Sequence, residues 1–194
     1  MAVFFTADLH FGHKNIMAFD DRPFKDIESH DAELIDRWNN KVGIDDEVYI
    51  LGDISWHNST KTIEILKQLN GNLHLIKGNH DAKLLKNRDV QKMFVEICDY
   101  KELYIADGKI LVLCHYPIPC FKNHYYGSYH FYGHVHIGFE YNMMLNVKRR
   151  MEESYHIPCN MHNVGTMLWN FEPVTFEEVT GKENSCCYLI NYKK

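Results

Sequence analysis

The chain has 194 residues, of which 45% are hydrophobic and 24% are charged, and its formal net charge is -5. This composition is typical of a globular protein and argues against intrinsic disorder, while the negative charge argues against a nucleic-acid binder that works by bulk electrostatics. No apolar run of roughly 18 residues occurs, so no membrane-spanning segment is expected, and the N-terminus lacks the pattern of a signal peptide.

Histidine is unusually frequent, with 13 residues. Because histidine is a common metal ligand and acid/base residue, the excess points to a chemical site. The six cysteines include no C-x-x-C pair, and Cys186 and Cys187 are adjacent, which makes a poor disulfide framework. Reduced thiols and a cytoplasmic location are therefore expected. The absence of repeats, low-complexity tracts and linkers predicts a single domain over residues 1–194.

Short runs rich in β-branched and aromatic residues predict the strands. They cover residues 3–6, 47–51, 73–77, 109–114, 128–132, 161–164 and 186–192. Helical periodicity predicts helices over residues 27–42, 59–69 and 82–94, the second with Ser59 as its N-cap. The alternation of strand and helix predicts an α/β fold. The C-terminal third is expected to hold more strand, in a second sheet or in an extension of the first.

Five of the predicted strands run directly into side chains that can bind a metal. The strand over residues 3–6 is followed by Asp8 and His10, and the others by Asp53, by Asn79, by His115, and by His134 with His136. In α/β folds the ligand site lies at the carboxyl ends of the strands, because the loops converge there. The five loops are therefore expected to build one site, and glycines just before Asp53, Asn79 and His134 allow tight turns after the strands.

The candidate ligands mix carboxylate, amide and imidazole donors. They are Asp8, His10, Asp53, Asn79, His115, His134 and His136. This donor set suits borderline divalent ions such as Mn, Fe or Zn, and seven ligands are too many for one tetrahedral ion. The set suits two ions that share a carboxylate. Each motif alone also fits a polar turn or surface histidines, so the prediction rests on their combination.

These motifs resemble the calcineurin-like metallophosphoesterase superfamily. The family pattern is Asp-x-His, Gly-Asp, Gly-Asn-His-Asp/Glu, a lone His and Gly-His-x-His, and it is present here as Asp8-Leu9-His10, Gly52-Asp53, Gly78-Asn79-His80-Asp81, His115 and Gly133-His134-Val135-His136. Less specific similarities to small single-domain bacterial and phage-type members occur at residues 11–15, 22–24, 38–39 and 163–165. The resemblance implies a four-layer sandwich of two mixed β-sheets flanked by α-helices.

The resemblance also assigns roles to these residues. It implies that Asp8, His10 and His136 bind one divalent ion, that Asn79, His115 and His134 bind a second, and that Asp53 bridges them. Mn is the expected metal, with Fe, Zn or Ni as alternatives. A metal-bridging hydroxide is then expected to attack phosphorus in a phosphate mono- or diester.

His80 is the candidate general acid, because it follows a ligand and is not needed as one. It is expected to protonate the leaving oxygen, with Asp81 orienting or charging its ring. The alternative is that His80 only makes a supporting hydrogen bond.

Three residues near the first motif are candidate substrate contacts: His13, Asn15 and Arg22. Arginine suits bidentate phosphate binding, although an exposed salt bridge or a helix cap is equally compatible with Arg22. Tyr116, Tyr125 and Tyr126 are candidates for stacking on a substrate ring, with packing as the alternative. His156, Cys159 and His162 have a loose metal-ligand spacing that lacks a fourth ligand, so their role is left open.

The sequence therefore predicts a metal-dependent phosphoric ester hydrolase. The chain leaves little room for a cap domain, so a small or exposed phosphate ester is expected, while nucleic acid is not supported by the charge. One alternative is an inactive phosphoesterase-like scaffold that binds a protein partner, which would lack a ligand. Another is a metal store or sensor, which needs no acid/base pair. The natural substrate, the ester preference, the native metal and the oligomeric state are left open.

Overall fold

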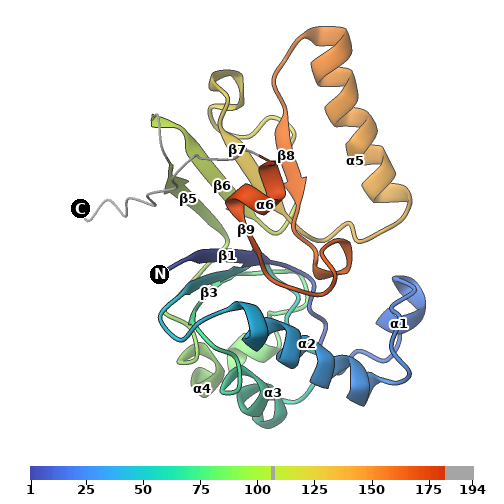
Figure 1. The fold of residues 1–194 in the computed structure, drawn as a ribbon, viewed down its shortest axis with the longest axis vertical. Helices are drawn as coiled ribbons and strands as arrows, with labels where there is room; N and C mark the ends of the chain where they lie inside the picture. Colours follow the sequence, from blue (N-terminus) through green and yellow to red (C-terminus); the bar gives the residue numbers. More distant parts are fainter. Residues whose placement is uncertain (106–107, 182–194) are drawn as a thin grey trace.

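The computed structural model describes residues 1–105 and 108–181, and it folds into two mixed β-sheets with several helices (Figure 1). The first sheet has the order β4-β3-β2-β1-β9 and the second has the order β5-β6-β7-β8. The strands are β1 (Val3–Thr6), β2 (Glu47–Ile50), β3 (Asn72–Ile76), β4 (Glu96–Cys98), β5 (Tyr100–Tyr104), β6 (Ile110–Cys114), β7 (Tyr129–Tyr132), β8 (Asn160–Asn163) and β9 (Val174–Thr175).

The α-helices alternate with the strands of the first sheet and are fewer in the second half. They are α1 (Ile16–Phe19), α2 (Ile27–Lys41), α3 (Ser59–Leu66), α4 (Arg88–Gln91), α5 (Phe139–Arg149) and α6 (Phe176–Thr180). Shorter turns are η1 (Leu84–Lys86), η3 (His124–Tyr126), the π-helical η4 (Arg150–Ser154) and η5 (Thr166–Leu168). Among the described residues, no helix is long and apolar enough to cross a bilayer.

Strand direction determines where the loops meet. Strands β1 to β4 are parallel neighbours and β9 pairs antiparallel with β1. In the second sheet β5 is antiparallel to β6, while β6, β7 and β8 are parallel. The α/β prediction and the second sheet are thereby confirmed. Since parallel strands end at the same edge, the loops after β1, β2 and β3 lie together, as do those after β6 and β7.

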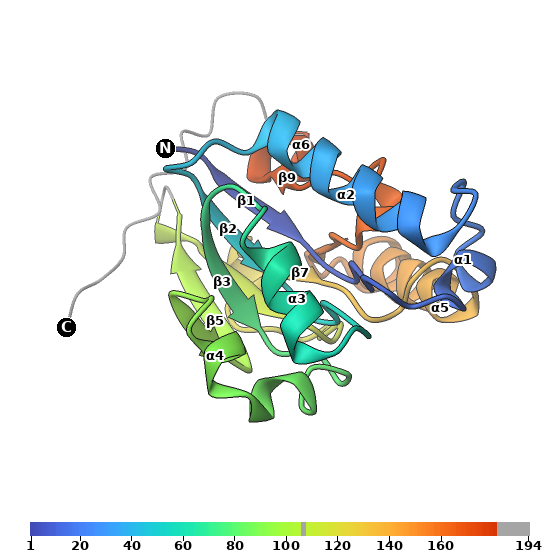
Figure 2. The ribbon, with the colours of Figure 1, turned by 90° about the horizontal axis from the view of Figure 1, so that it is seen from below.

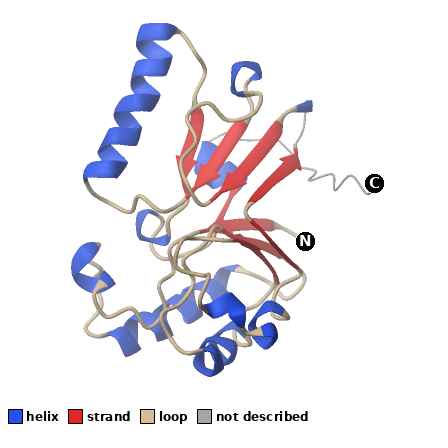
Figure 3. Ribbon diagram, turned by 180° about the vertical axis from the view of Figure 1, so that it is seen from behind, coloured by secondary structure: helices blue, strands red, loops and turns tan. Residues whose placement is uncertain are grey.

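Three apolar layers hold the sheets and helices together. Side chains such as Phe4 and Trp38 fill the space between the first sheet and α2, α3 and α4. Phe5 and Phe131 belong to the layer between the two sheets, and Val112 belongs to the layer under α5. Phe4 and Phe5 point to opposite faces because side chains alternate along a strand. Figures 1 and 2 show the resulting order of helices, sheet, sheet and helix. Figure 3 shows from behind that several helices lie below the first sheet and that the long helix α5 lies on one side of the second.

Helix boundaries follow the local capping residues. Helix α2 matches its prediction to within one residue, because Asp26 accepts from the backbone N–H of Ser29 and forms a capping box with it. Helix α3 begins at Ser59 as predicted, but the N-cap is Asn58, whose side chain accepts from the N–H of Lys61. The prediction of Ser59 as the cap is therefore wrong.

The third predicted helix, over residues 82–94, is also wrong in extent. Its segment divides at Asn87, whose side chain accepts from the N–H groups of Asp89 and Val90 and so starts the new helix α4. Strand β8 covers residues close to those predicted, whereas the predicted strand over residues 186–192 lies outside the described residues. Strand β5 and helix α5 were not predicted, because their exposed apolar residues obscure the periodicity.

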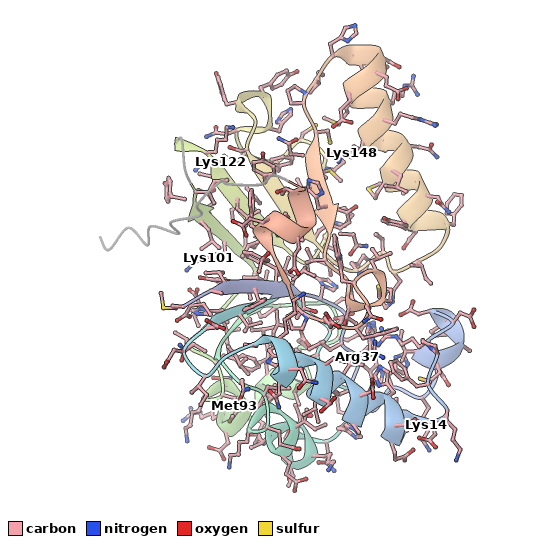
Figure 4. The ribbon with its side chains drawn as sticks, viewed as in Figure 1. Lys14, Arg37, Met93, Lys101, Lys122 and Lys148 are labelled. Carbon is pink, nitrogen blue, oxygen red and sulfur yellow. The ribbon has the colours of Figure 1, made fainter. Side chains whose placement is uncertain are left out.

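The last part of the described chain returns to the first sheet. Strand β9 pairs with β1, and the segment before it contacts helix α2 through Arg37 (Figure 4). The guanidinium of Arg37 donates to the backbone oxygen and the side-chain oxygen of Asn170 at 2.7 and 2.9 Å. This contact anchors the chain where it passes from the second sheet back to the first.

Candidate metal centre

Loops from both sheets converge around the carboxylate of Asp53. Its Oδ2 atom lies 3.9 Å from His10 Nε2 and 3.7 Å from His115 Nε2. The Nε2 atom of His80 is 4.0 Å from the same oxygen. These residues follow β1, β2, β3 and β6, so strands that are far apart in sequence deliver their side chains to one point.

Three of the candidate ligands form a buried group that we call the first cluster: Asp8, His10 and His136. Their ligand atoms lie within 4.8 Å of one another. The two Nε2 atoms of His10 and His136 are 3.2 Å apart, and Asp8 Oδ1 is 3.9 Å from His136 Nε2. Asp8 and His10 are fully buried, so the group can hold an ion away from bulk water.

Three further candidates form what we call the second cluster: Asn79, His115 and His134. The Oδ1 atom of Asn79 lies 2.9 Å from His115 Nε2 and 2.9 Å from His134 Nδ1. Asn79 is exposed and His134 is half-buried. Asp53 lies between the two clusters, because its carboxylate faces both His10 and His115.

Hydrogen bonds aim the imidazole rings of His115 and His136. His115 Nδ1 donates to the backbone oxygen of Leu51 at 2.7 Å, which leaves the lone pair of a neutral ring on Nε2. That lone pair faces the oxygen of Asn79, and two acceptors 2.9 Å apart repel unless a cation or a proton lies between them. His136 Nδ1 donates to both carboxylate oxygens of Asp20, at 2.9 and 3.0 Å, and Nε2 faces the first cluster. Such outer hydrogen bonds are typical of metal-binding histidines.

The electrostatics of the centre also fit a cation. Burial, with a smaller contribution from the charge of Asp53, raises the pKa of Asp8 to about 6, although His136 and His115 oppose the shift. Burial lowers the pKa of His10 far below its usual range and lowers that of His134 as well, so both rings are neutral donors. Buried carboxylates beside neutral imidazoles are stabilised by a bound dication.

The backbone is left-handed at five of the seven candidate ligands. The φ angles are 57° at Asp8, 55° at His10, 54° at Asp53, 71° at His134 and 37° at His136. Each such residue costs about 1–3 kcal/mol unless the surroundings compensate, and this strain gathers at functional sites. The conformation that turns these five side chains inward therefore lowers the conformational stability of the chain.

Two glycines leave the space that the candidate carboxylates occupy. A Cβ atom at Gly78 would lie 2.3 Å from Asp53 Oδ1, and one at Gly133 would lie 2.7 Å from Asp8 Oδ2. Both separations are shorter than real Cβ contacts. Any larger residue at these positions would displace a carboxylate from the centre.

No protein-family model matches this chain. An uncharacterized protein of Methanocaldococcus jannaschii, MJ1445, is 42% identical over 81 residues, which cover 41% of this chain and 46% of that protein. The Gene 66 protein of Mycobacterium phage L5 is 44% identical over 92 residues, which cover 46% of this chain and 44% of the phage protein. The chain thus spans about half the length of the curated relatives it matches.

A solved structure is similar over most of the chain. It is a protein of unknown function, AQ665, from Aquifex aeolicus, with a TM-score of 0.66 and 25% identity. The match covers 91% of this chain and 96% of the Aquifex protein. The fold is therefore shared with a solved protein, and the chemistry has to be argued from the site.

Arg22 does not contact substrate, contrary to the prediction. Its side chain is buried, and its guanidinium donates to the backbone oxygens of Leu9 and Asp8, at 3.0 and 2.9 Å, and twice to the carboxylate of Asp20. It also lies 2.8 Å from His30 Nε2. All five guanidinium N–H groups are directed at these partners, so Arg22 supports the backbone that carries Asp8 and His10. The alternatives of an exposed salt bridge and a helix cap are wrong too.

Asp81 does not orient His80, which corrects a second prediction. Its buried carboxylate accepts from the backbone N–H groups of Asp53 and Ile54 at 3.0 Å each, and from Gly78 at 2.8 Å. Asp81 therefore joins the loop after β2 to the loop after β3. Burial raises the pKa of Asp81, and these three hydrogen bonds oppose the shift.

His80 and His13 lie beside the centre, and both contact a tryptophan that the sequence did not single out. Trp56 stacks on His13 with ring centroids 4.1 Å apart, and its centroid is 4.6 Å from that of His10 and 4.4 Å from that of His80. The His80 side chain is 51% exposed, so its tip reaches solvent. Trp56 follows Asp53 by three residues, and that proximity in sequence is the signal that could have found it.

The remaining candidates differ in how close they come to the centre. His13 Nδ1 is 3.3 Å from His10 Nδ1, and Tyr116 contacts the rings of His115 and His134. Asn15 is exposed at the start of α1 and makes no side-chain cap there, so its substrate contact stays a prediction. Tyr125 and Tyr126 are exposed in η3, where the Tyr125 ring contacts His124.

Residues 156–162 do not form a metal site within the described part of the chain. His156 is exposed and Cys159 is fully buried under α5, whereas His162 packs its ring near Tyr129 and Phe131 between the sheets. Among the described residues these three therefore do not appear as a group of potential metal ligands. The described cysteines, Cys98, Cys114, Cys120 and Cys159, are free thiols, as expected.

Proposed function

We propose that this chain is a metal-dependent phosphoesterase of the calcineurin-like metallophosphoesterase superfamily, acting on phosphate mono- or diesters. The observation that carries the proposal is the position of Asp53. Its carboxylate is surrounded by imidazole nitrogens from both sheets, with a cluster of candidate ligands on either side. A carboxylate shared by two ligand sets is the arrangement that dinuclear hydrolases need.

In this proposal the first cluster would hold one divalent ion and the second cluster the other, with Asp53 as a ligand of both. The donor set suits Mn, and Fe, Zn or Ni are alternatives. When bound, two such ions would supply a water of lowered pKa and positive charge for the phosphoryl oxygens. Asp20 and the backbone oxygen of Leu51 keep Nε2 of His136 and of His115 directed at the centre.

In this proposal His80 would donate a proton to the leaving oxygen. Its backbone N–H donates to Asp53 Oδ1 at 3.0 Å, which fixes the base of the side chain. The ring lies against Trp56 while its tip is exposed, so it can reach a bound ester and exchange protons with solvent. Orientation of the ring comes from Trp56 and Asp53 rather than from Asp81.

The alternative of an inactive scaffold expects a missing ligand, and all seven candidates are present around Asp53. A protein that only stores metal does not need an exposed imidazole such as that of His80 beside the ligands. The cytoplasmic location and the preference for a small or exposed ester stay part of the proposal.

A substrate panel tests the proposal. Phosphomonoesters and phosphodiesters are assayed with Mn, Ni, Zn and Mg, and bound metal is measured in the same samples. We expect two metal equivalents per chain and turnover of at least one ester class. Protein that holds two metals and hydrolyses no ester with any ion would overturn the enzyme proposal.

The role of His80 makes a sharper prediction. His80→Ala should lower turnover roughly 10²- to 10⁴-fold for esters with poor leaving groups, which need a proton, and much less for activated nitrophenyl esters. The exposed His156 serves as the control, since His156→Ala should change neither. Equal losses on both ester types in His80→Ala would leave His80 with a supporting hydrogen bond only.

A further inference from the structure

A cavity opens beside the candidate centre and extends away from it. Its volume is about 700 Å³, and it is lined by residues 55–59, 79–80 and 82–84. This volume lies within the range of sites that bind small organic molecules. The cavity is therefore larger than a phosphoryl group alone requires.

The position of His80 indicates which part of the substrate the cavity would receive. His80, Asn79 and Trp56 line the cavity where it borders the centre, and Lys83 belongs to the same lining. If His80 protonates the leaving oxygen, as the proposed function holds, the leaving group must lie on the side of the centre that His80 reaches. The cavity is on that side, so it is the space in which the leaving group sits.

The lining carries one permanent charge, which is positive. Lys83 is exposed at the start of η1, and no carboxylate contributes to the lining. Two other lysines of the first half of the chain are paired, Lys61 with Glu64 at 3.3 Å and Lys77 with Asp99 at 2.8 Å. Within the described residues Lys83 has no such ion pair.

The rest of the lining includes both polar and apolar groups. Asn58 and Ser59 supply amide and hydroxyl groups, while Trp56 and Leu84 supply apolar surface. Trp56 is 37% exposed, so part of its indole is available to a bound molecule. An organic group with a flat or apolar body and one anionic substituent would match these surfaces.

We propose that this cavity is a leaving-group subsite and that Lys83 selects esters whose leaving group carries a second negative charge. The inference rests on the proposed function, because His80 defines the leaving-group side. It names the substrate class as phosphate esters of anionic organic groups, in which the second charge is a phosphate or a carboxylate. An unpaired ammonium in the lining of a cavity without carboxylates is complementary to either anion.

A series of aryl esters tests the subsite. Phenyl phosphate is compared with 3-carboxyphenyl phosphate and with 1,3-phenylene bisphosphate, and their methyl diesters form a parallel series. For the native chain we expect kcat/KM to be about fivefold higher for the charged esters, the effect of a solvent-exposed ion pair. The preference should shrink in high salt. A preference for only one of the two anions identifies which substituent the subsite takes.

Lys83→Gln should abolish this preference. Lys86→Gln is the matched control, because Lys86 is an exposed lysine of the same turn that does not line the cavity, and it should retain the preference. Lys83→Glu should reverse the preference in favour of phenyl phosphate. A ratio that is unchanged in Lys83→Gln, or that falls equally in Lys86→Gln, would overturn the subsite.

Binding separates this inference from the proposed function. Phenylphosphonate and 3-carboxyphenylphosphonate are titrated into the Mn-loaded native chain and into Lys83→Gln by calorimetry. Tighter binding of the carboxylated compound that disappears in Lys83→Gln supports the subsite even when no ester is turned over, in which case only the hydrolase proposal fails. Equal affinities of the native chain for the two phosphonates overturn the subsite.

Discussion

The two clusters of the candidate centre are supported in different ways. Behind the first cluster lies a buried chain of charges: Asp20 accepts from His136, and Arg22 donates to Asp20 at 2.8 and 3.0 Å. The Nη1 atom of Arg22 also lies 2.8 Å from Nε2 of His30. Bonds to His136 and Arg22 hold the pKa of Asp20 below its usual value although burial opposes this.

Behind the His115 ring of the second cluster the supports are neutral. His115 donates to the backbone oxygen of Leu51, and the loop after His115 is held by His130. The Nε2 atom of His130 accepts from the N–H of Ile118 at 3.1 Å, and its Nδ1 donates to the backbone oxygen of Val112 at 3.1 Å. No carboxylate takes part in these contacts.

The difference predicts unequal metal sites. A buried charge network is costly to assemble, but once formed it fixes its members in one geometry. Neutral backbone bonds constrain less, and Asn79 in the second cluster is exposed. We therefore expect the first cluster to bind its ion more tightly and the second to exchange its ion more readily.

The largest effect is expected from Asp53, which both clusters share. Asp53→Asn removes the carboxylate charge that faces both sides, so both metal affinities should fall and turnover should drop by more than about a hundredfold, beyond what loss of an outer hydrogen bond causes. Metal content by mass spectrometry and steady-state kinetics measure this. A variant that keeps two tightly bound ions would contradict the shared position.

A substitution of Asp20 should affect the first cluster alone and so distinguish the two metal sites. Asp20→Asn removes the charge that orients His136, so calorimetry with Mn should show the first affinity falling about 10- to 100-fold while the second is unchanged. The second site is an internal control for folding, and Asp21→Asn, at the exposed neighbouring residue, should alter neither site. If both affinities fell together, the two supports would not be independent.

Asn79 gives the reciprocal test. Asn79→Ala removes a neutral oxygen donor from the second cluster, and we expect a loss of about tenfold in the weaker Mn affinity with the tighter one retained. Asn142→Ala, at an exposed position of α5, controls for the loss of an amide. A loss confined to the tighter site would reverse the assignment of the clusters.

The smallest effect on the centre is expected from His130, whose role is in stability. Burial lowers the pKa of His130 from 6.5 to about 4, so the unfolded chain binds a proton between these pH values and the folded chain does not. The free energy of unfolding should therefore fall as the pH drops through this window, by up to about 3 kcal/mol from this group. Urea unfolding of the native chain and of His130→Gln measures it. Parallel pH profiles would show that His130 is not the neutral support inferred here.

The candidate ligands, whose metal binding stays a prediction, could be singled out because each lies directly after a buried strand. A run such as residues 47–51 ends at Gly52 and Asp53, so local sequence places the side chain at the carboxyl end of a strand. The partners of the ligands carry no such pattern. Asp20 and His136 are 116 residues apart, and Asp20 sits in a loop without periodicity. The roles of Arg22 and Asp81 were wrong for the same reason, since their backbone partners come from other segments.

Local sequence was sufficient to predict the α/β class, the strands that lead into the centre, and the seven candidate ligands, because these depend on apolar runs and on the residues directly after each run. The division of the candidate ligands into two clusters was implied by the family resemblance, but the groups that support each cluster became visible only in the folded chain. The same is true of Trp56, which lies among the histidines, and of Lys83, which stands unpaired in a cavity beside His80. These features arise from contacts between loops that are distant in the sequence, and such contacts leave no periodic trace along the chain.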